Sequence, residues 1–233
     1  MADSSILMSG ASEEYRQSRE QLRSAEIDLR DRIEEVAVMR RSLPSGPVVP
    51  DYEFIEGEKH IRLSELFADG KRYLILYHLM YSAKDENFCP MCSLWIDGFN
   101  GIAPHVTQRA NFVIASRAPV DKLQAWGAHR EWHRLRLLSD DAPTFARDIG
   151  AEDADGNADS TIVVFAKDGD EVRHFYTAHP MLEDRERGID LLCPVWHLFD
   201  LMPSGRDDWY GSNDGFDASL QASAALGAPL ERA

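Results

Sequence analysis

The chain has 233 residues and a formal net charge of −15 at pH 7, from 25 lysines and arginines against 40 aspartates and glutamates. This acidic balance argues against nucleic acid and anionic membranes as partners, because both bind basic surfaces. Three cysteines on a chain of this length do not form a secreted disulfide scaffold, and neither a secretory leader nor a membrane-spanning apolar run is evident, so we expect a cytoplasmic protein.

Residues 13–41 are predicted to form one helix with a narrow apolar stripe. Glu, Arg and Gln dominate the segment, and no Gly or Pro interrupts it. We expect the helix to pack along its own domain, and its alternative role is to join two chains in a homodimer. Prolines and a glycine between Leu43 and Pro47 end the helix, so residues 1–50 are assigned to a helical extension and a proline-rich linker.

An apolar strand is predicted at Tyr73–Met80, after a short strand at 52–55 and one or two helical turns at 63–67. Both alternating faces of Tyr73–Met80 are apolar, as is typical of a central strand that is covered on both sides of a parallel sheet. The loop that follows contains a lysine and two acids at 84–86 and is expected to touch substrate. Because these charges oppose each other, they leave open how a thiol beside them is activated.

His78 is the one polar residue in this apolar strand. Strand alternation places it on the face that it shares with Leu74, Leu76 and Met80. We favour a hydrogen-bonded core histidine. The alternative is a catalytic one, in which His78 takes the proton that Cys92 must lose when it attacks.

A Cys-x-x-Cys motif within Phe88–Trp95 opens the next predicted helix. Pro90 suits the first helical position, so Cys89 stands at the helix N-terminus, where free N–H groups and the helix dipole favour a thiolate. Cys92 falls on the apolar face that the helix must bury. The pattern predicts a redox dithiol, in which Cys89 is the accessible attacking thiolate and Cys92 is the sheltered resolving thiol.

Half of a structural zinc site is one alternative for this cysteine pair. Such a site needs four nitrogen or sulfur ligands, and the chain offers no second pair with the usual spacing. Two ordinary core cysteines are another alternative, against which the proline and the preceding strand argue. We therefore expect neither a metal nor another cofactor, and we assign the remaining cysteine, Cys193, to the core.

The rest of the chain alternates strands and helices up to about residue 203. Strands are predicted at 111–116, 135–138, 161–165 and 172–176. Helices are predicted after 119, within 141–150 with a start signal at Asp141 and Pro143, and at 189–201, where Pro194 kinks or restarts the helix. An Asp-Gly turn at 168–169 joins the last two strands into an antiparallel hairpin. Gly, Asp, Ser and Ala without periodicity then predict a loosely held tail over 204–233.

This order of elements predicts an α/β, thioredoxin-like fold over 51–203, with an N-terminal helical extension and a loosely ordered C-terminal tail. The alternating strands and helices make a parallel pair, and the hairpin completes the sheet. The dithiol then lies at the start of the helix that follows the central strand.

Short motifs spread from about Glu13 to Trp209 match a known family: Arg40–Pro44, Leu63–Phe67, Tyr77–Met80, Cys89–Ser93, Ser116–Pro119, His174–Tyr176 and Leu201–Arg206. On these motifs the chain resembles the bacterial thioredoxin-like proteins of domain of unknown function 899. The resemblance implies a thioredoxin-like fold and a dithiol site at Cys89 and Cys92, and it implies no particular substrate. His78 and Arg117 fall inside shared motifs, which adds them to the site candidates.

Departures from thioredoxin itself bear on substrate binding. The cis-proline that faces the dithiol in thioredoxins corresponds to Ser160 here, and the residues around the first cysteine are Phe88 and Pro90. The docking of a protein substrate is expected to differ accordingly. Phe88, Pro90, Ser160 and Arg117 are the predicted substrate-binding residues.

The predicted function is a thiol-disulfide oxidoreductase that cycles Cys89 and Cys92 between dithiol and disulfide. Its partners would be a protein or small-molecule disulfide and a thiol reductant, because no nucleotide-binding glycine pattern is present. A thiol peroxidase is one alternative, although Ser82 and Glu86 stand where a peroxiredoxin-like motif has proline and threonine. A non-catalytic thioredoxin-like binding module is the other alternative.

Overall fold

A computed structural model describes residues 9–81, 87–140, 142, 144–179 and 190–225. The chain divides into two units, Met1–Pro44 and Ser45–Ala233. Among the described residues, no helix is both long enough and apolar enough to cross a membrane.

The described residues of the first unit form α1 (Glu13–Arg41), which has the bounds that the sequence predicts. The Ser12 side chain caps its N-terminus by accepting a hydrogen bond from the Tyr15 N–H. Glutamates in the first turn and arginines in the last turn complement the helix dipole. Local signals therefore account for both ends of this helix.

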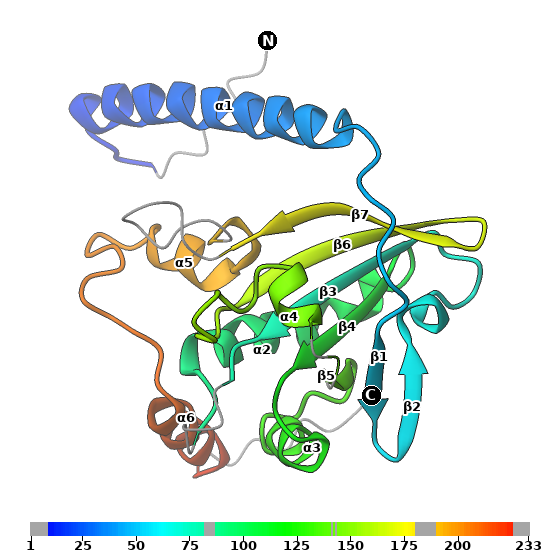
Figure 1. Cartoon of the computed structure of the whole chain (residues 1–233). Coiled ribbons are helices and arrows are strands. Elements are labelled where there is room, and N and C mark those ends of the chain that lie inside the picture. Colours follow the sequence, from blue (N-terminus) through cyan, green and yellow to red (C-terminus); the bar gives the residue numbers. More distant parts are fainter. Residues whose placement is uncertain (1–8, 82–86, 141, 143, 180–189, 226–233) are drawn as a thin grey trace. The chain divides into compact units, whose positions relative to one another are not determined.

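The second unit is built on a seven-stranded sheet with the order β2-β1-β5-β4-β3-β6-β7 (Figure 1). Its strands are β1 (Glu53–Glu56), β2 (Lys59–Arg62), β3 (Tyr73–Leu79), β4 (Asn111–Ser116), β5 (Arg136–Asp140), β6 (Thr161–Asp168) and β7 (Glu171–Ala178). β3, β4 and β5 run parallel to one another, and β6 and β7 continue the sheet as an antiparallel hairpin beside β3. The predicted interior strand is therefore β3, and the predicted hairpin is β6–β7.

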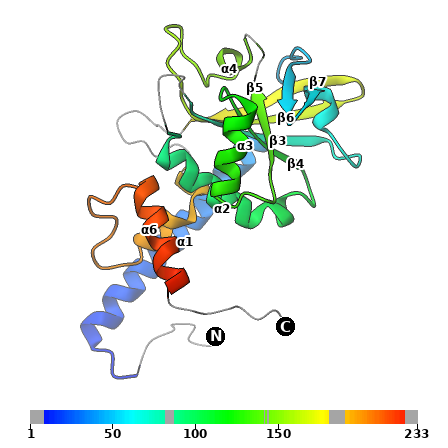
Figure 2. The ribbon, with the colours of Figure 1, turned by 90° about the horizontal axis from the view of Figure 1, so that it is seen from below.

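Two helices connect the parallel strands: α2 (Pro90–Val106) joins β3 to β4, and α3 (Val120–His129) joins β4 to β5. They lie side by side (Figure 2), and the Trp126 indole N–H donates a hydrogen bond to Ser93 between them. The shorter elements are η1 (Leu63–Leu66), α4 (Phe145–Asp148), η3 (Asp190–Leu192) and α5 (Pro194–Phe199). Parallel strands joined by a helix that starts at the dithiol, followed by an antiparallel hairpin, make the predicted thioredoxin-like fold.

The sheet separates two apolar clusters, one on each face. Tyr77 and Leu79 of β3 pack on one face with residues of α2 and α3, and Cys92 lies in this cluster. Leu76 of β3 packs on the other face, with Phe145 of α4. Alternation along β3 therefore decides which of its side chains meet the dithiol.

The predicted helix at 189–201 restarts at Pro194 in the structure, one of the two outcomes expected at this proline. η3 and α5 are separate elements, because Pro194 starts α5 at its first turn, where a proline has no N–H to leave unpaired. Residue 189 lies outside the described residues, as do Asp141 and Pro143, which supplied the predicted start signal of α4.

The C-terminal segment contains α6 (Asn213–Ala225), which the sequence analysis does not predict. The Asn213 side chain donates a hydrogen bond to the Phe88 carbonyl at 3.0 Å, and the Phe216 ring lies 3.5 Å from the Arg130 guanidinium carbon. Through these contacts α6 packs against the C-terminal end of α3 and against Phe88, which precedes the dithiol.

Candidate active site

The dithiol sits at the N-terminus of α2. Cys89 is the N-cap residue and Pro90 follows in the first turn, as the sequence predicts. The Cys89 sulfur accepts a hydrogen bond from the Cys92 backbone N–H at 3.4 Å, which places both cysteines within one helical turn. Both thiols are free; Cys89 is half-buried, and Cys92 is buried with 2% of its surface exposed.

The two thiols have different acidities. The pKa of Cys89 is lowered to about 7, chiefly by a hydrogen bond from the Cys92 thiol; backbone N–H groups reinforce the effect, and burial opposes it. The pKa of Cys92 is raised, because its thiol donates that hydrogen bond to Cys89 and because it is buried. The negative charge of the pair therefore resides on Cys89, the more accessible sulfur.

We expect alkylation of Cys89 by iodoacetamide to become faster as pH rises and to reach half its maximal rate at about pH 7. Only the thiolate reacts, so the rate follows the deprotonated fraction, which is small below that pH and nearly complete above it. The native protein is alkylated across neutral pH, and the peptides containing Cys89 and Cys92 are quantified by mass spectrometry. The buried Cys92 serves as the internal control and should stay unmodified; a midpoint near 8.5, the value of an ordinary thiol, would contradict this geometry.

Phe88 and Pro90 flank Cys89 but differ in exposure. The Phe88 side chain is buried and stacks on the Trp126 ring, with the ring centroids 5.5 Å apart. It supports the dithiol from the core, so the structure does not bear out a substrate-contacting role for this side chain. Pro90 is half-buried at the helix tip beside Cys89 and stays a candidate for substrate contact.

Ser160 lies buried immediately before β6. Its backbone N–H donates a hydrogen bond to the Asp159 carboxylate at 2.6 Å. Its side chain forms a hydrogen bond with the Tyr77 side chain. The Tyr77 side chain also forms a hydrogen bond with the Cys92 thiol, so Tyr77 connects Ser160 to the dithiol. Tyr77 is not among the site residues predicted from the sequence. The signal was present: alternation places Tyr77 on the face of β3 opposite to that of His78.

His78 does not reach the dithiol. It lies on the face of Leu74 and Leu76, as predicted, and this face is opposite to the one that α2 covers. The favoured prediction of a core histidine is confirmed for its burial, although neither ring nitrogen has a hydrogen-bond partner among the described residues. The alternative, a proton acceptor for Cys92, is wrong. Met80 also differs from its predicted face, because β3 ends at Leu79 and Met80 packs against the dithiol-side cluster.

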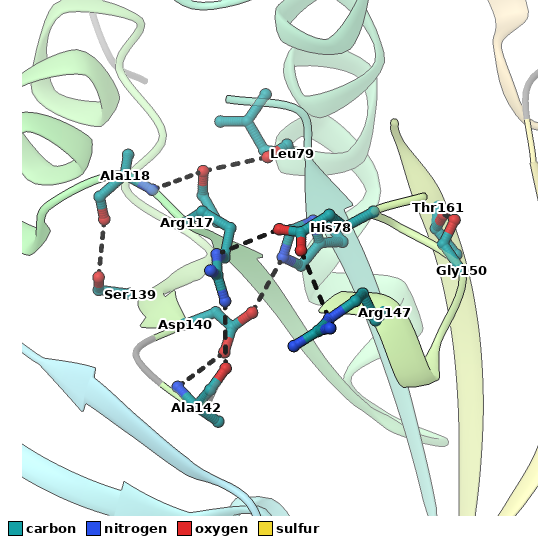
Figure 3. A network of polar contacts seen from close by, with 12 residues as sticks. His78, Leu79, Arg117, Ala118, Ser139, Asp140, Ala142, Arg147, Gly150 and Thr161 are labelled. Atoms are coloured by element: carbon teal, nitrogen blue, oxygen red, sulfur yellow. Dashed lines mark hydrogen bonds and ion pairs between the residues drawn. The ribbon is translucent and has the colours of Figure 1, made fainter. Parts of the chain in front are cut away.

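A polar network surrounds His78 on its own face of the sheet (Figure 3). The His78 ring points toward the Asp140 carboxylate, with Nε2 and Oδ2 3.5 Å apart, and both side chains are buried. Arg117 lies in the same network: its guanidinium donates to the Ala142 carbonyl and faces the Glu152 carboxylate at 3.7 Å. The structure thus links Arg117 to His78 through Ala142 and Asp140. A role of Arg117 in substrate binding stays a prediction.

The acidic and basic residues predicted to touch substrate, Lys84, Asp85 and Glu86, lie outside the described residues. Within the part of the chain that is described, no cluster of three or more histidine, cysteine, aspartate or glutamate side chains is arranged to hold a metal ion.

A family model described as "Bacterial protein of unknown function (DUF899)" matches residues 7–219. No curated protein matches the chain. The match covers α1, the sheet and the dithiol, and it extends into α6.

Among solved structures, the chain is similar to peroxidoxin BcpB from Mycobacterium tuberculosis, with 21% identity and a TM-score of 0.49 over 65% of this chain and 95% of that chain. It is also similar to reduced Prx3 in complex with hydrogen peroxide from Vibrio vulnificus, with 18% identity and a TM-score of 0.47 over 66% and 99% of the two chains. It is likewise similar to peroxiredoxin 5 from Alvinella pompejana, with 19% identity and a TM-score of 0.46 over 64% of this chain and 96% of that chain. At these identities and TM-scores the likeness assigns no chemistry to this chain.

Proposed function

Because the chain belongs to the family described as bacterial protein of unknown function (DUF899), a description that assigns no chemistry, we propose its function from the site itself: a thiol-disulfide oxidoreductase. One observation carries the proposal. Cys89 stands at a helix N-terminus with its pKa lowered to about 7, and it contacts a second, buried thiol. A thiolate that forms near neutral pH beside a resolving thiol is the arrangement that disulfide exchange requires.

The reaction proceeds in two exchanges. The Cys89 thiolate attacks one sulfur of a substrate disulfide, the substrate S–S bond breaks, and the other substrate sulfur leaves as a thiolate. Cys92 then loses its proton and attacks the Cys89 sulfur, which releases the second substrate thiol and closes a Cys89–Cys92 disulfide. The substrate gains two electrons and two protons, and an external thiol reductant restores the dithiol by the reverse exchanges.

The helix geometry supports this division of labour. The N-terminal N–H groups and the helix dipole stabilise negative charge on Cys89 without an added cation. Cys92, one turn further along α2, is too buried to meet a bulky disulfide but is within one turn of the Cys89 sulfur. Substrate selection is therefore assigned to Cys89 and its exposed surroundings, and a protein or small-molecule disulfide is the substrate class.

The test is a redox titration of the full chain against glutathione, with thiols counted by alkylation and mass spectrometry. We expect a reversible two-electron transition confined to Cys89 and Cys92, whereas Cys193, buried in the same core, is alkylated only after denaturation at every potential. The midpoint states whether the protein mainly reduces or mainly oxidises its partners, because about 30 mV corresponds to about 1.4 kcal/mol for a two-electron couple.

The same titration, together with a reaction of the reduced protein with hydrogen peroxide, distinguishes the oxidoreductase from the binding module and the thiol peroxidase. If both active-site thiols stay free at every glutathione potential, the oxidoreductase is contradicted and the binding module is favoured. If hydrogen peroxide oxidises Cys89 much faster than a disulfide does, the thiol peroxidase replaces the oxidoreductase, with a sulfenic acid on Cys89 that Cys92 resolves.

A further inference from the structure

We propose that the Tyr77 hydroxyl, held by Ser160, is a further catalytic group that stabilises the Cys92 thiolate when Cys92 attacks the mixed disulfide. The proposal rests on the dithiol function proposed above. It assigns a step that the two cysteines cannot perform alone, namely the formation of a thiolate in the core.

The need for such a group follows from the burial of Cys92. In the reduced protein the Cys92 thiol donates its hydrogen to the Cys89 thiolate, so Cys92 itself stays neutral. Once Cys89 is bonded to a substrate sulfur, its charge is gone and Cys92 must become the thiolate, with only 2% of its surface exposed. A buried anion without hydrogen-bond donors is strongly disfavoured.

Tyr77 supplies a donor at this position. It belongs to the same cluster as Cys92, is 1% exposed, and its ring is fixed edge-on against Phe99 with the centroids 5.4 Å apart. Burial and the neighbouring Cys92 raise the pKa of Tyr77, while the hydrogen bond between the two lowers that of Cys92. These are the directions expected when the phenol O–H donates to the sulfur, and the Met80 backbone N–H provides a second donor.

Ser160 orients the phenol. The hydrogen bond between Ser160 and Tyr77 lowers the pKa of Tyr77, as expected when the serine hydroxyl donates to the phenol oxygen. Ser160 immediately precedes Thr161, which pairs with His78 in the β3–β6 register, so it lies beside the end of β3, where Leu79 packs in the cluster that contains Cys92. The donors therefore run in series from Ser160 to Tyr77 to Cys92, and a hydrogen bond accepted by the phenol strengthens the one that it donates.

The other titratable groups nearby do not replace Tyr77. His78 is on the opposite face of the sheet, and Asp159 acts on Cys89, where its charge raises the pKa. Of the described titratable side chains, Cys89 and Tyr77 have the largest effects on the Cys92 thiol. Tyr77 is the one of these two that remains a donor after Cys89 has bonded to substrate.

The assisted step is balanced as follows. The Cys92 sulfur gives its proton to solvent, with the resulting charge held by the Tyr77 O–H, and forms a bond to the Cys89 sulfur. The bond between Cys89 and the substrate sulfur breaks, and the departing substrate thiolate takes up one proton from solvent. Tyr77 stays protonated throughout, as the raised pKa of this buried phenol requires.

The experiment is a stopped-flow reaction of the reduced full chain with dithiobis(nitrobenzoic acid). Attack by Cys89 releases one coloured nitrothiobenzoate in a first phase, and attack by Cys92 on the resulting mixed disulfide releases a second in a later phase. Tyr77→Phe removes only the hydroxyl. Tyr52→Phe is the matched control, because Tyr52 is also a buried tyrosine whose hydroxyl donates a hydrogen bond, to Asp148 at 2.6 Å on the other face of the sheet.

We expect Tyr77→Phe to leave the first phase unchanged and to slow the second by about 3- to 10-fold, because a hydrogen bond to a charged sulfur is lost and a more basic thiolate regains about half of that loss as nucleophilicity. The pH profile of the second phase should move to higher pH. Ser160→Ala should slow the same phase by a smaller factor, and Tyr52→Phe should change neither phase.

Equal second-phase rates in Tyr77→Phe and in the wild type would overturn the assignment. Should Tyr77→Phe fail to fold, Ser160→Ala decides by the same criterion, because an unchanged second phase in that variant leaves no role for the donor series. A wild-type protein that shows no first phase would instead overturn the dithiol function, and this proposal with it.

Discussion

Replacement of Cys89 by serine is expected to lower turnover of a disulfide substrate to below about 1% of the wild-type rate, because a serine hydroxyl stays protonated at neutral pH and does not attack a disulfide sulfur. The fold should be preserved, since Cys89 is half-buried at the helix tip and a serine oxygen can also cap α2 by accepting from the Cys92 N–H. The measurement is the reduction of a protein disulfide with dithiothreitol as the recycling thiol.

Two further variants separate the roles of the cysteines. Cys92→Ser keeps the attacking thiolate but cannot resolve it, so the mixed disulfide with substrate should accumulate and be visible as a mass increase on Cys89. Cys193→Ala is the control, because this cysteine is buried beside α5 and takes no part in the proposed exchange. Wild-type turnover in Cys89→Ser would refute the oxidoreductase whatever the other variants do.

The dithiol and its helix could be located from sequence because their signals are local. The proline after Cys89 predicts where α2 begins, and the apolar spacing that includes Cys92 predicts which side of α2 is buried. The same holds for β3 and for the β6–β7 hairpin, whose Asp-Gly turn lies between its two strands. Elements that are specified by adjacent residues are the ones that the sequence analysis places correctly.

The partners of the site depend on contacts between distant segments, which local patterns do not encode. Alternation correctly placed His78 with Leu76, but it does not state which face of the sheet α2 covers. Tyr77 therefore holds the position beside Cys92 that the catalytic alternative gave to His78. The choice of face is made by the right-handed crossover and by the packing of whole helices.

The C-terminal helix α6 illustrates a second limit. Its residues show little apolar periodicity, because its attachment uses an amide hydrogen bond from Asn213 and the ring of Phe216 on Arg130 in place of a continuous apolar stripe. Arg130 is buried, and it lies far from α6 in the sequence. Apolar periodicity therefore does not predict a helix that is attached by a few specific contacts.

Asp140→Ala is expected to lower the free energy of unfolding by about 2–3 kcal/mol, within the range for buried polar groups that are left without a partner. Asp140 and His78 are both buried, 3.5 Å apart, and within the described part of the chain neither ring nitrogen of His78 has a hydrogen-bond partner. The variant leaves the imidazole in the core without its carboxylate and also removes the acceptor of the Ala142 N–H. Urea unfolding followed by circular dichroism measures the change.

The surface pair of His60 and Glu53 is the matched control, since it also joins a histidine to a carboxylate, at 2.9 Å, but is largely exposed. Glu53→Ala should cost less than about 1 kcal/mol, and a loss in Asp140→Ala no larger than this would show that the buried pair is not a structural one. Replacing both His78 and Asp140 by leucine should regain much of the lost stability, because no polar group is then left unpaired. Since this pair and the dithiol lie on opposite faces of the sheet, folded Asp140→Ala should keep wild-type thiol release from Cys89, which separates the stability of the fold from the chemistry of the site.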